Sequence, residues 1–206
     1  MAGSLARTAR HHLAALRMLV VFTVITGLAY PLAVTGIAQL AFSHHANGSV
    51  IRDGGRPVAS SLIGQKFNLP PPKGRTTGAP DPRWFQPRPS AGGYDPAKSG
   101  ASNLGPNNAG LAKAVTDRRA AVAAFDGVPP SSVPADAITA SGSGLDPDIS
   151  PAYAYEQVNR VAKARAAPPS AVRKLVADHV QGRTLGFLGQ EHVNVVALNR
   201  ALTALK

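Results

Sequence analysis

The sequence has 206 residues, and its 22 Lys and Arg outnumber its 11 Asp and Glu, so the formal net charge is +11. These basic residues are scattered rather than interleaved with the few aromatic residues, which argues against a groove that binds nucleic acid. The absence of cysteine excludes a disulfide framework and a thiolate metal site. A hydrophobic fraction of 44%, with 18 Pro and 20 Gly, indicates a folded α+β protein with long loops.

Residues 18–42 contain no Asp, Glu, Lys or Arg. As a helix this stretch is about 37 Å long, which is enough to span a bilayer with some tilt. The apolar core of a signal peptide is only about 7 to 15 residues long and precedes a small-residue cleavage site, which is not found here. We therefore predict a retained transmembrane helix over residues 18–42.

Basic residues flank this span on one side only. Three arginines lie within residues 1–17, whereas the first charged residue after the span is Arg52. The positive-inside rule therefore predicts that residues 1–17 are a cytoplasmic tail and that residues 43–206 form an extracytoplasmic domain. The expected protein is a single-pass protein of the cell membrane with one mixed α+β domain outside, and its helix contacts lipid.

The span also carries small and polar residues that a plain lipid anchor does not need. Such residues let helices approach closely and form hydrogen bonds across an interface, so they are candidate contacts with partner helices. The alternative is that they are merely tolerated in a membrane helix and that its proline marks a kink. The candidates are Thr26, Gly27, Tyr30, Pro31, Gly36 and Gln39.

The first part of the outer domain reads as a hairpin followed by a long loop. Residues 56–64 alternate in polarity after a turn signal at 53–55, which predicts a strand or hairpin. Residues 68–110 are rich in proline and read as loop. So long a loop in a small domain is more often functional or mobile than idle.

The sequence of the second part of the domain predicts helices, and their first residues can be identified. Asn107 or Asn108 can cap a helix over 108–125, and Ser150 can cap a second helix whose first position is a proline. Ser170 is the predicted cap of a third helix. A short strand and a last helix over roughly 194–205 complete the prediction.

No motif for catalysis is present. The loop at 141–147 has neither the Gly-x-Ser-x-Gly pattern of a serine-hydrolase elbow nor the lysine of a phosphate-binding P-loop. No carboxylates are spaced for acid and base catalysis, and the adjacent His44 and His45 fit the membrane interface better than a metal site. We predict no catalytic residue, no metal site and no tightly bound cofactor.

The segment 138–150 is the most informative one in the domain. A short apolar entry leads into a loop rich in glycine and hydroxyl groups, and a capped helix follows. Such a loop can present backbone donors and acceptors to a partner or ligand, although an ordinary strand-to-helix connection explains it equally well. The candidate residues of this loop are Ser141, Gly142, Ser143, Gly144, Leu145 and Asp146.

Ordered motifs from about Leu16 to Leu205 carry a family resemblance. They are Thr26–Leu32, Asn47–Ser49, Leu62–Phe67, Trp84–Ala91, Ser99–Pro106, Thr139–Ser150, Gln157–Ala162 and Val193–Asn199. With these motifs the chain resembles the C subunits of the bacterial Kdp high-affinity potassium-transporting P-type ATPases.

The resemblance implies a non-catalytic subunit of an ATP-driven potassium importer. Its partners would be a channel-like potassium-translocating subunit, a P-type ATPase subunit and usually a very small fourth subunit. ATP and potassium would act on the complex, with this subunit supporting assembly and acting as a catalytic chaperone that raises the affinity for ATP. The implied site residues are Arg88 and the 141–146 loop for partner contacts and Gln157 for the ATP effect.

The predicted topology keeps the outer domain away from cytoplasmic ATP. We therefore expect a structural role, in which the helix docks on partner helices and the domain covers the potassium entrance. The alternative function is a membrane-tethered extracytoplasmic binding module that acts outside any pump. An anchored hydrolase with an unrecognised site is a third reading.

Overall fold

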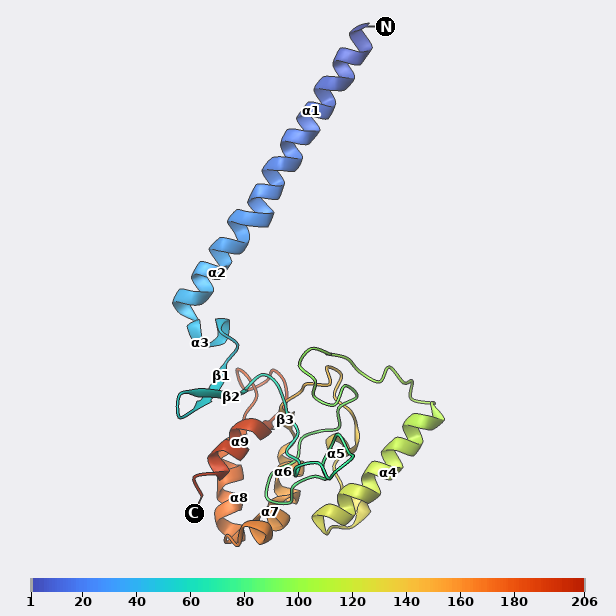
Figure 1. The fold of residues 1–206 in the computed structure, drawn as a ribbon, viewed down its shortest axis with the longest axis vertical. Coiled ribbons are helices and arrows are strands. Elements are labelled where there is room, and N and C mark those ends of the chain that lie inside the picture. The colour runs from blue at the N-terminus through green and yellow to red at the C-terminus, as the bar shows by residue number, and fades with distance from the viewer. Residues whose placement is uncertain (1, 206) are drawn as a thin grey trace. The chain divides into compact units, whose positions relative to one another are not determined.

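A computed structural model describes residues 2–205, which divide into two compact units between Val50 and Ile51. The first unit is mainly one long helix made of α1 (Ala2–Val24), the π-helical turn η1 (Ile25–Ala29) and α2 (Tyr30–Ala41), shown in blue in Figure 1. The short helix α3 (Ser43–Ala46) follows. By length and composition, Arg7–Ala41 could cross a membrane, because an 18-residue stretch within it has a mean hydropathy of 2.0, which confirms one apolar N-terminal helix.

The π-helical turn inside the long helix is explained by Pro31. Proline has no N–H to donate, and in an α-helix its ring collides with the carbonyl four residues earlier, here that of Gly27. The helix widens instead, and the Tyr30 N–H donates to the Ile25 carbonyl. Thr26 Oγ1 also donates to the Phe22 carbonyl over 2.7 Å. The Tyr30-Pro31 pair therefore changes the helical geometry in the middle of the apolar span.

The second unit, which we call the C-terminal domain, begins with the predicted hairpin. Strands β1 (Val50–Asp53) and β2 (Arg56–Ser60) form a two-stranded sheet. The turn between them consists of Gly54 and Gly55, with φ of 53° and 83°. Two successive positive φ values are typical of the type I′ turn, which matches the twist of paired strands and favours glycine.

A small antiparallel sheet lies at the centre of the domain. Its strand order is β3 (Asp148–Ile149), β5 (His192–Asn194) and β4 (Val180–Gln181). Ile149 and Val180 both pair with Val193 on the central strand. This pairing ends helix α8 at His179, because the next two residues leave the helix to form β4. Gly182, a residue type that often ends helices, lies beyond the strand rather than directly after α8.

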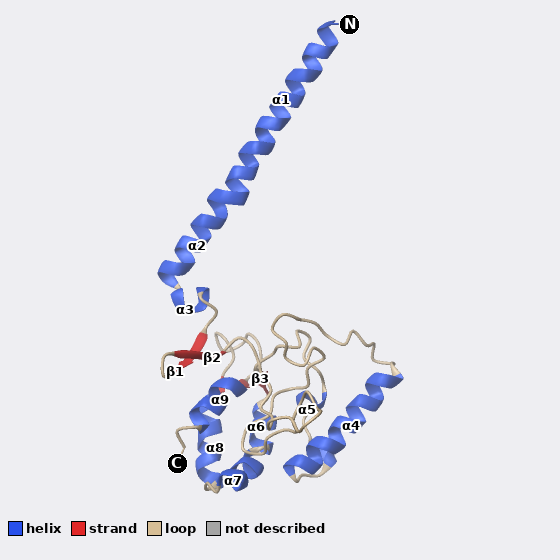
Figure 2. Ribbon diagram, viewed as in Figure 1, coloured by secondary structure: helices blue, strands red, loops and turns tan. Residues whose placement is uncertain are grey.

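Helices form the rest of the regular structure (Figure 2). They are α4 (Ala109–Asp126), η2 (Pro130–Ser132), α5 (Ala135–Ile138), α6 (Pro151–Glu156), α7 (Val158–Arg165), α8 (Pro169–His179) and α9 (Val195–Leu202). Asn108 and Ser150 cap α4 and α6 as predicted. The predicted cap at Ser170 is wrong, because α8 already begins at Pro169, whose missing N–H and fixed φ suit the first helical position.

The hydrophobic core lies among helices α6 to α9 and strand β5. Its largest fully buried apolar side chains are Phe85, Leu198, Leu202, Val158, Val161, Val172, Val176, Val193 and Val195. The mixed helix and sheet content confirms the α+β fold class.

Phe85 comes from the long loop rather than from a helix or strand. Between Ser60 and Ala109 the described chain has no helix or named strand, yet Asp81, Phe85 and Gln86 are buried. A buried backbone without secondary structure must find other hydrogen-bond partners. The loop predicted from its prolines is therefore real, but part of it is built into the core.

Two amide side chains supply those partners. Asn199 Nδ2 donates to the Phe85 carbonyl, and Asn199 Oδ1 accepts from the Phe85 N–H, both over 2.9 Å. Gln157 repeats this arrangement on Gln86, with Oε1 accepting from its N–H over 2.6 Å and Nε2 donating to its carbonyl over 3.1 Å. We call these two side chains the amide pair. They hold the loop on the junction of α6 and α7 and on α9 by paired hydrogen bonds, as a neighbouring strand would.

Replacing one member of the amide pair should destabilise the domain. In Asn199→Leu the Phe85 N–H and carbonyl lose their partners while buried, which costs about 2 to 4 kcal/mol of unfolding free energy. Trp84 is the only tryptophan and lies next to Phe85, so its fluorescence reports urea unfolding of the loop. Asn159→Leu, at an exposed position of α7, is the control and should change stability little. Equal stability of the two variants would contradict a role of Asn199 in holding the buried Phe85 backbone.

Candidate partner interface

The packing of the described chain does not require glycine at the two glycine positions of the long helix. A Cβ added to Gly27 would meet only the Thr23 methyl at 4.0 Å, and one added to Gly36 would meet none of the described residues within 4 Å. Tyr30, on the same helix, is 67% exposed. Because nothing within the described chain fills the space beside the two glycines, a neighbouring helix could approach closely there.

Gln39, in contrast, has an internal role. Its amide forms reciprocal hydrogen bonds with the Asn47 side chain, over 3.1 and 3.4 Å. Asn47 also donates to the Ser43 carbonyl over 2.7 Å. Gln39 therefore ties the end of α2 to the turn of α3, so it is a weaker candidate for partner contact than the glycines.

The loop at 141–146 is fixed by hydrogen bonds to other segments of the domain. The Ser141 N–H donates to the Pro89 carbonyl over 3.0 Å, and the Gly64 N–H donates to the Leu145 carbonyl over 2.7 Å. Gly144 receives a bond from Ser90 Oγ on its carbonyl over 2.6 Å. Most of the polar groups that the sequence suggested for a partner are therefore used inside the domain.

An ion pair joins two residues that were predicted separately as contacts. Arg88 Nη1 lies 3.0 Å from Asp146 Oδ2, and both side chains are about three quarters buried. The Tyr94 hydroxyl donates to the Arg88 carbonyl over 2.7 Å, and burial raises the pKa of Tyr94. Only Gly142 and Ser143 of the loop are exposed. They form its outward tip, which is the part available to a partner.

Gln157 cannot touch a ligand in solution, because its side chain is fully buried. Besides Gln86, it accepts a hydrogen bond from Arg160 Nη2 over 2.6 Å. Arg160 in turn donates to the carbonyls of Pro82 and Trp84 and pairs with the buried Asp126. An effect of Gln157 on another subunit would therefore pass through the loop that it holds.

Sequence reasoning missed Asn199 and Arg160. Asn199 follows Val195 by four positions and precedes Leu202 by three, so the helical period places it on the core face of α9. A polar residue on such a face needs a buried partner, which was the available signal. Arg160 offered no comparable signal, because its charged partner Asp126 lies 34 residues away in the sequence.

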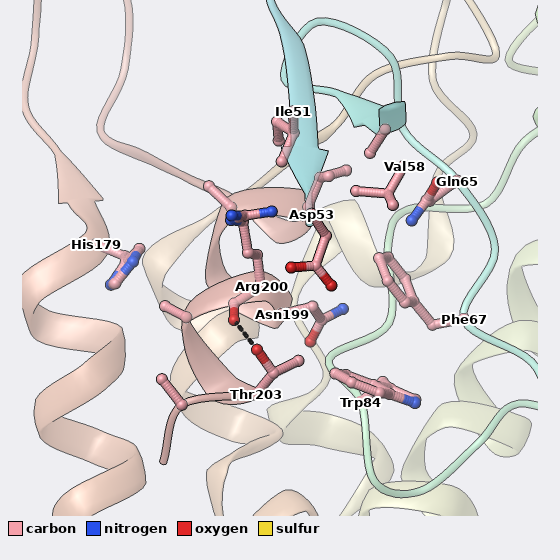
Figure 3. A pocket seen from close by; sticks show the side chains of 15 residues that line it. Ile51, Asp53, Val58, Gln65, Phe67, Trp84, His179, Asn199, Arg200 and Thr203 are labelled. Carbon is pink, nitrogen blue, oxygen red and sulfur yellow. Dashed lines mark hydrogen bonds between the residues drawn. The ribbon is translucent and has the colours of Figure 1, made fainter. Parts of the chain in front are cut away.

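The larger cleft of the domain lies between the hairpin and α9 (Figure 3). It has a volume of about 610 Å³, with Phe67 and Trp84 on one side and Asp53 and Arg200 among its polar lining. Neither Asp53 nor Arg200 has an ion-pair partner among the described residues. The lining mixes polar and apolar side chains, several of them exposed. Such a lining suits contact with another protein better than binding of one small molecule.

Three acidic side chains come together where α4, α5 and α6 meet. Burial first, and then the charges of Asp126 and Asp136, raise the pKa of Glu156 to about 7. Burial also raises the pKa of Asp126, although the Arg160 charge opposes this. Across residues 2–205, no group of three or more His, Cys, Asp or Glu residues has the geometry of a metal site.

Glu156 should make stability depend on pH. Its folded pKa is raised above the ordinary value of 4.5, so its contribution is fully present below pH 4.5 and is lost as pH rises through 7. Glu156→Gln removes this ionisation, so the variant should match the wild type near pH 4 and melt at a higher temperature at pH 8. Thermal unfolding between pH 4 and 8.5 measures the difference. If the two melting temperatures differ by the same amount at every pH in this range, the raised pKa of Glu156 would be contradicted.

Two glycines of the loop provide a matched test of its packing. Gly144 has φ of 70°, and a Cβ there would lie 2.7 Å from the Gly100 carbonyl oxygen, whereas a Cβ on Gly142 meets no described atom within 4 Å. Gly144→Ala should therefore lower the stability by about 1 to 3 kcal/mol, and Gly142→Ala should not. Urea unfolding followed by Trp84 fluorescence distinguishes them. Equal losses would show that the loop is not held as described.

Comparisons with known proteins identify the family. The family model described as "KdpC: K+-transporting ATPase, c chain" matches residues 12–204. The Potassium-transporting ATPase KdpC subunit of Streptomyces avermitilis is 52% identical over 218 residues, covering 100% of this chain and 98% of that protein.

Two further relatives carry the same name. The protein of Kineococcus radiotolerans is 53% identical over 91% of this chain and 90% of its own length. That of Caulobacter vibrioides is 53% identical over 89% of this chain and 87% of its own length. These matches confirm the resemblance that the ordered motifs indicated. The chain therefore belongs to the KdpC family, the non-catalytic c chains of Kdp potassium-transporting ATPases.

Proposed function

We propose that this chain supports assembly of the Kdp potassium pump by docking its membrane helix on helices of the channel-like and ATPase subunits. The observation that carries this proposal is the space beside Gly27 and Gly36, which no described residue of the chain fills. In a membrane, close helix packing replaces the hydrophobic effect as the driving force for association. Membership in a family of pump subunits supplies the partner helices.

The C-terminal domain, in this proposal, lies outside the membrane and rests on the potassium entrance. The charge pattern supports this side, because the basic tail precedes the helix. The domain is suited to a fixed contact, since its long loop is held by buried hydrogen bonds rather than left mobile. The exposed tip at Gly142 and Ser143 is the proposed point of contact with a partner.

The higher ATP affinity expected of the pump is, in our proposal, an indirect effect. The domain lies on the opposite side of the membrane from cytoplasmic ATP, and Gln157 is buried. Binding to one conformation of a partner shifts its equilibrium toward that conformation. The chain would thus favour the ATP-binding conformation of the ATPase subunit by docking on it, without contacting the nucleotide.

The double variant Gly27→Leu/Gly36→Leu tests helix docking. The two leucines should block close approach while preserving the apolar span, so membrane insertion stays normal and recovery of the channel-like and ATPase subunits falls several-fold. Recovery is measured by purifying the tagged chain in mild detergent from membranes of its host. Val20→Leu, on the same helix, is the control because it changes apolar volume without filling a glycine site.

Two results would count against docking through the glycines. One is unchanged recovery of the partner subunits with the double variant. The other is an equal loss with Val20→Leu, which would indicate general sensitivity of the helix to added volume. A lower ATP affinity of the pump that accompanies loss of docking would support the indirect effect.

A further inference from the structure

A second cavity of the C-terminal domain has a different lining from the cleft in Figure 3. It has a volume of about 330 Å³ and lies between helix α4 and the loop segments 66–68 and 86–94. This volume is within the range of small-molecule sites. Three basic residues line it, and three aromatic residues line it with them: Lys66, Arg88, Arg118, Tyr94, Phe125 and Tyr153.

The positive charges in this lining are incompletely balanced. Arg88 pairs with Asp146, but Lys66 and Arg118 have no acidic partner among the described residues. Within the part of the chain that the structure describes, Arg118 donates only to the Ile138 carbonyl, over 3.1 Å. None of the described residues that line the cavity is acidic. Bringing three cations to one cavity is unfavourable unless an anion accompanies them.

Nearby carboxylates do not serve as that anion. Asp136, next to the lining residue Ala137, accepts hydrogen bonds from the Ser150 N–H and hydroxyl over 2.7 and 2.9 Å. Asp126, next to Phe125, is buried and pairs with Arg160 on the other side. The acidic groups around the cavity are thus engaged elsewhere.

Two details concern the basic side chains that line this cavity. Arg88 Nε is buried and has no acceptor among the described residues, which is costly for a charged group. Lys66 Nζ lies 3.1 Å from the place where a Cβ on Gly93 would be, and Gly93 has φ of 65°. The glycine therefore leaves room for the ammonium group against the backbone. An anion in the cavity could pair with the Lys66 ammonium group and with Arg118, neither of which has an acidic partner among the described residues.

We propose that this cavity binds a small organic anion, with a carboxylate or phosphate group on a compact apolar body. The three cations would hold the anionic group by charge-assisted hydrogen bonds. The rings of Tyr94, Phe125 and Tyr153, together with three prolines, would cover the apolar part. The ligand is a free metabolite or the headgroup of an anionic lipid, since both present this chemistry. The site does not depend on the proposed assembly role.

The test uses the full chain in neutral detergent with phenyl phosphate, benzoate and inorganic phosphate as probes in isothermal titration. Phenyl phosphate and benzoate should bind and inorganic phosphate should bind less well, because it has no apolar body. Arg118→Gln should weaken binding about tenfold or more through loss of a charge-assisted hydrogen bond. Arg119→Gln, the neighbouring arginine outside the cavity, is the matched control and should leave affinity unchanged.

Lys66→Gln is a second variant with an exposed side chain, so it tests the site even if Arg118→Gln fails to fold. It should also weaken binding of phenyl phosphate several-fold. Absence of binding by all three probes would overturn the proposal. Equal weakening by Arg118→Gln and Arg119→Gln would overturn it too, because that result shows only attraction to net positive charge.

The intact complex distinguishes the two ligand sources. Competition of phenyl phosphate by phosphatidylglycerol nanodiscs, but not by phosphatidylcholine nanodiscs, would identify a lipid headgroup. Competition by neither would identify a soluble anion. Both results support the site. Binding to the isolated chain that disappears in the lipid-free complex would contradict it, because a partner side chain would then fill the cavity.

Discussion

A buried backbone without regular secondary structure is the constraint on which the C-terminal domain depends. Phe85 and Gln86 enter the core from a proline-rich loop, and their N–H and carbonyl groups must be satisfied there. Asn199 and Gln157 supply those bonds from two helices. The same segment continues to Arg88, which fixes the 141–146 loop and lines the smaller cavity. The amide pair therefore positions both the 141–146 loop and the smaller cavity.

The two units of the chain differ in whether their candidate contact residues already have partners within the chain. In the C-terminal domain, polar side chains such as Gln157 are buried and form hydrogen bonds within the domain. In the helix, Gly27 and Gly36 have no internal function among the described residues. The helix therefore presents space for partner helices, whereas the domain presents a small exposed loop tip and a cavity lined by basic residues.

Local features could be predicted from the sequence, and distant contacts could not. Asn108, Ser150 and the turn at 54–55 act within a few residues, so their residue types determine the structure. Arg88 and Asp146 lie 58 residues apart, and Gln86 and Gln157 lie 71 apart, so no periodicity links them. The proline content of the loop correctly predicted irregular backbone. It carried no information that part of this backbone is buried.

The most direct test of the account is to purify the chain with a C-terminal tag from its host under potassium limitation and to identify what accompanies it. The account predicts stoichiometric channel-like and P-type ATPase subunits, with potassium-stimulated ATP hydrolysis in the purified complex. Recovery of the chain alone, folded and stable, would contradict it. That result would favour a membrane-tethered binding module instead.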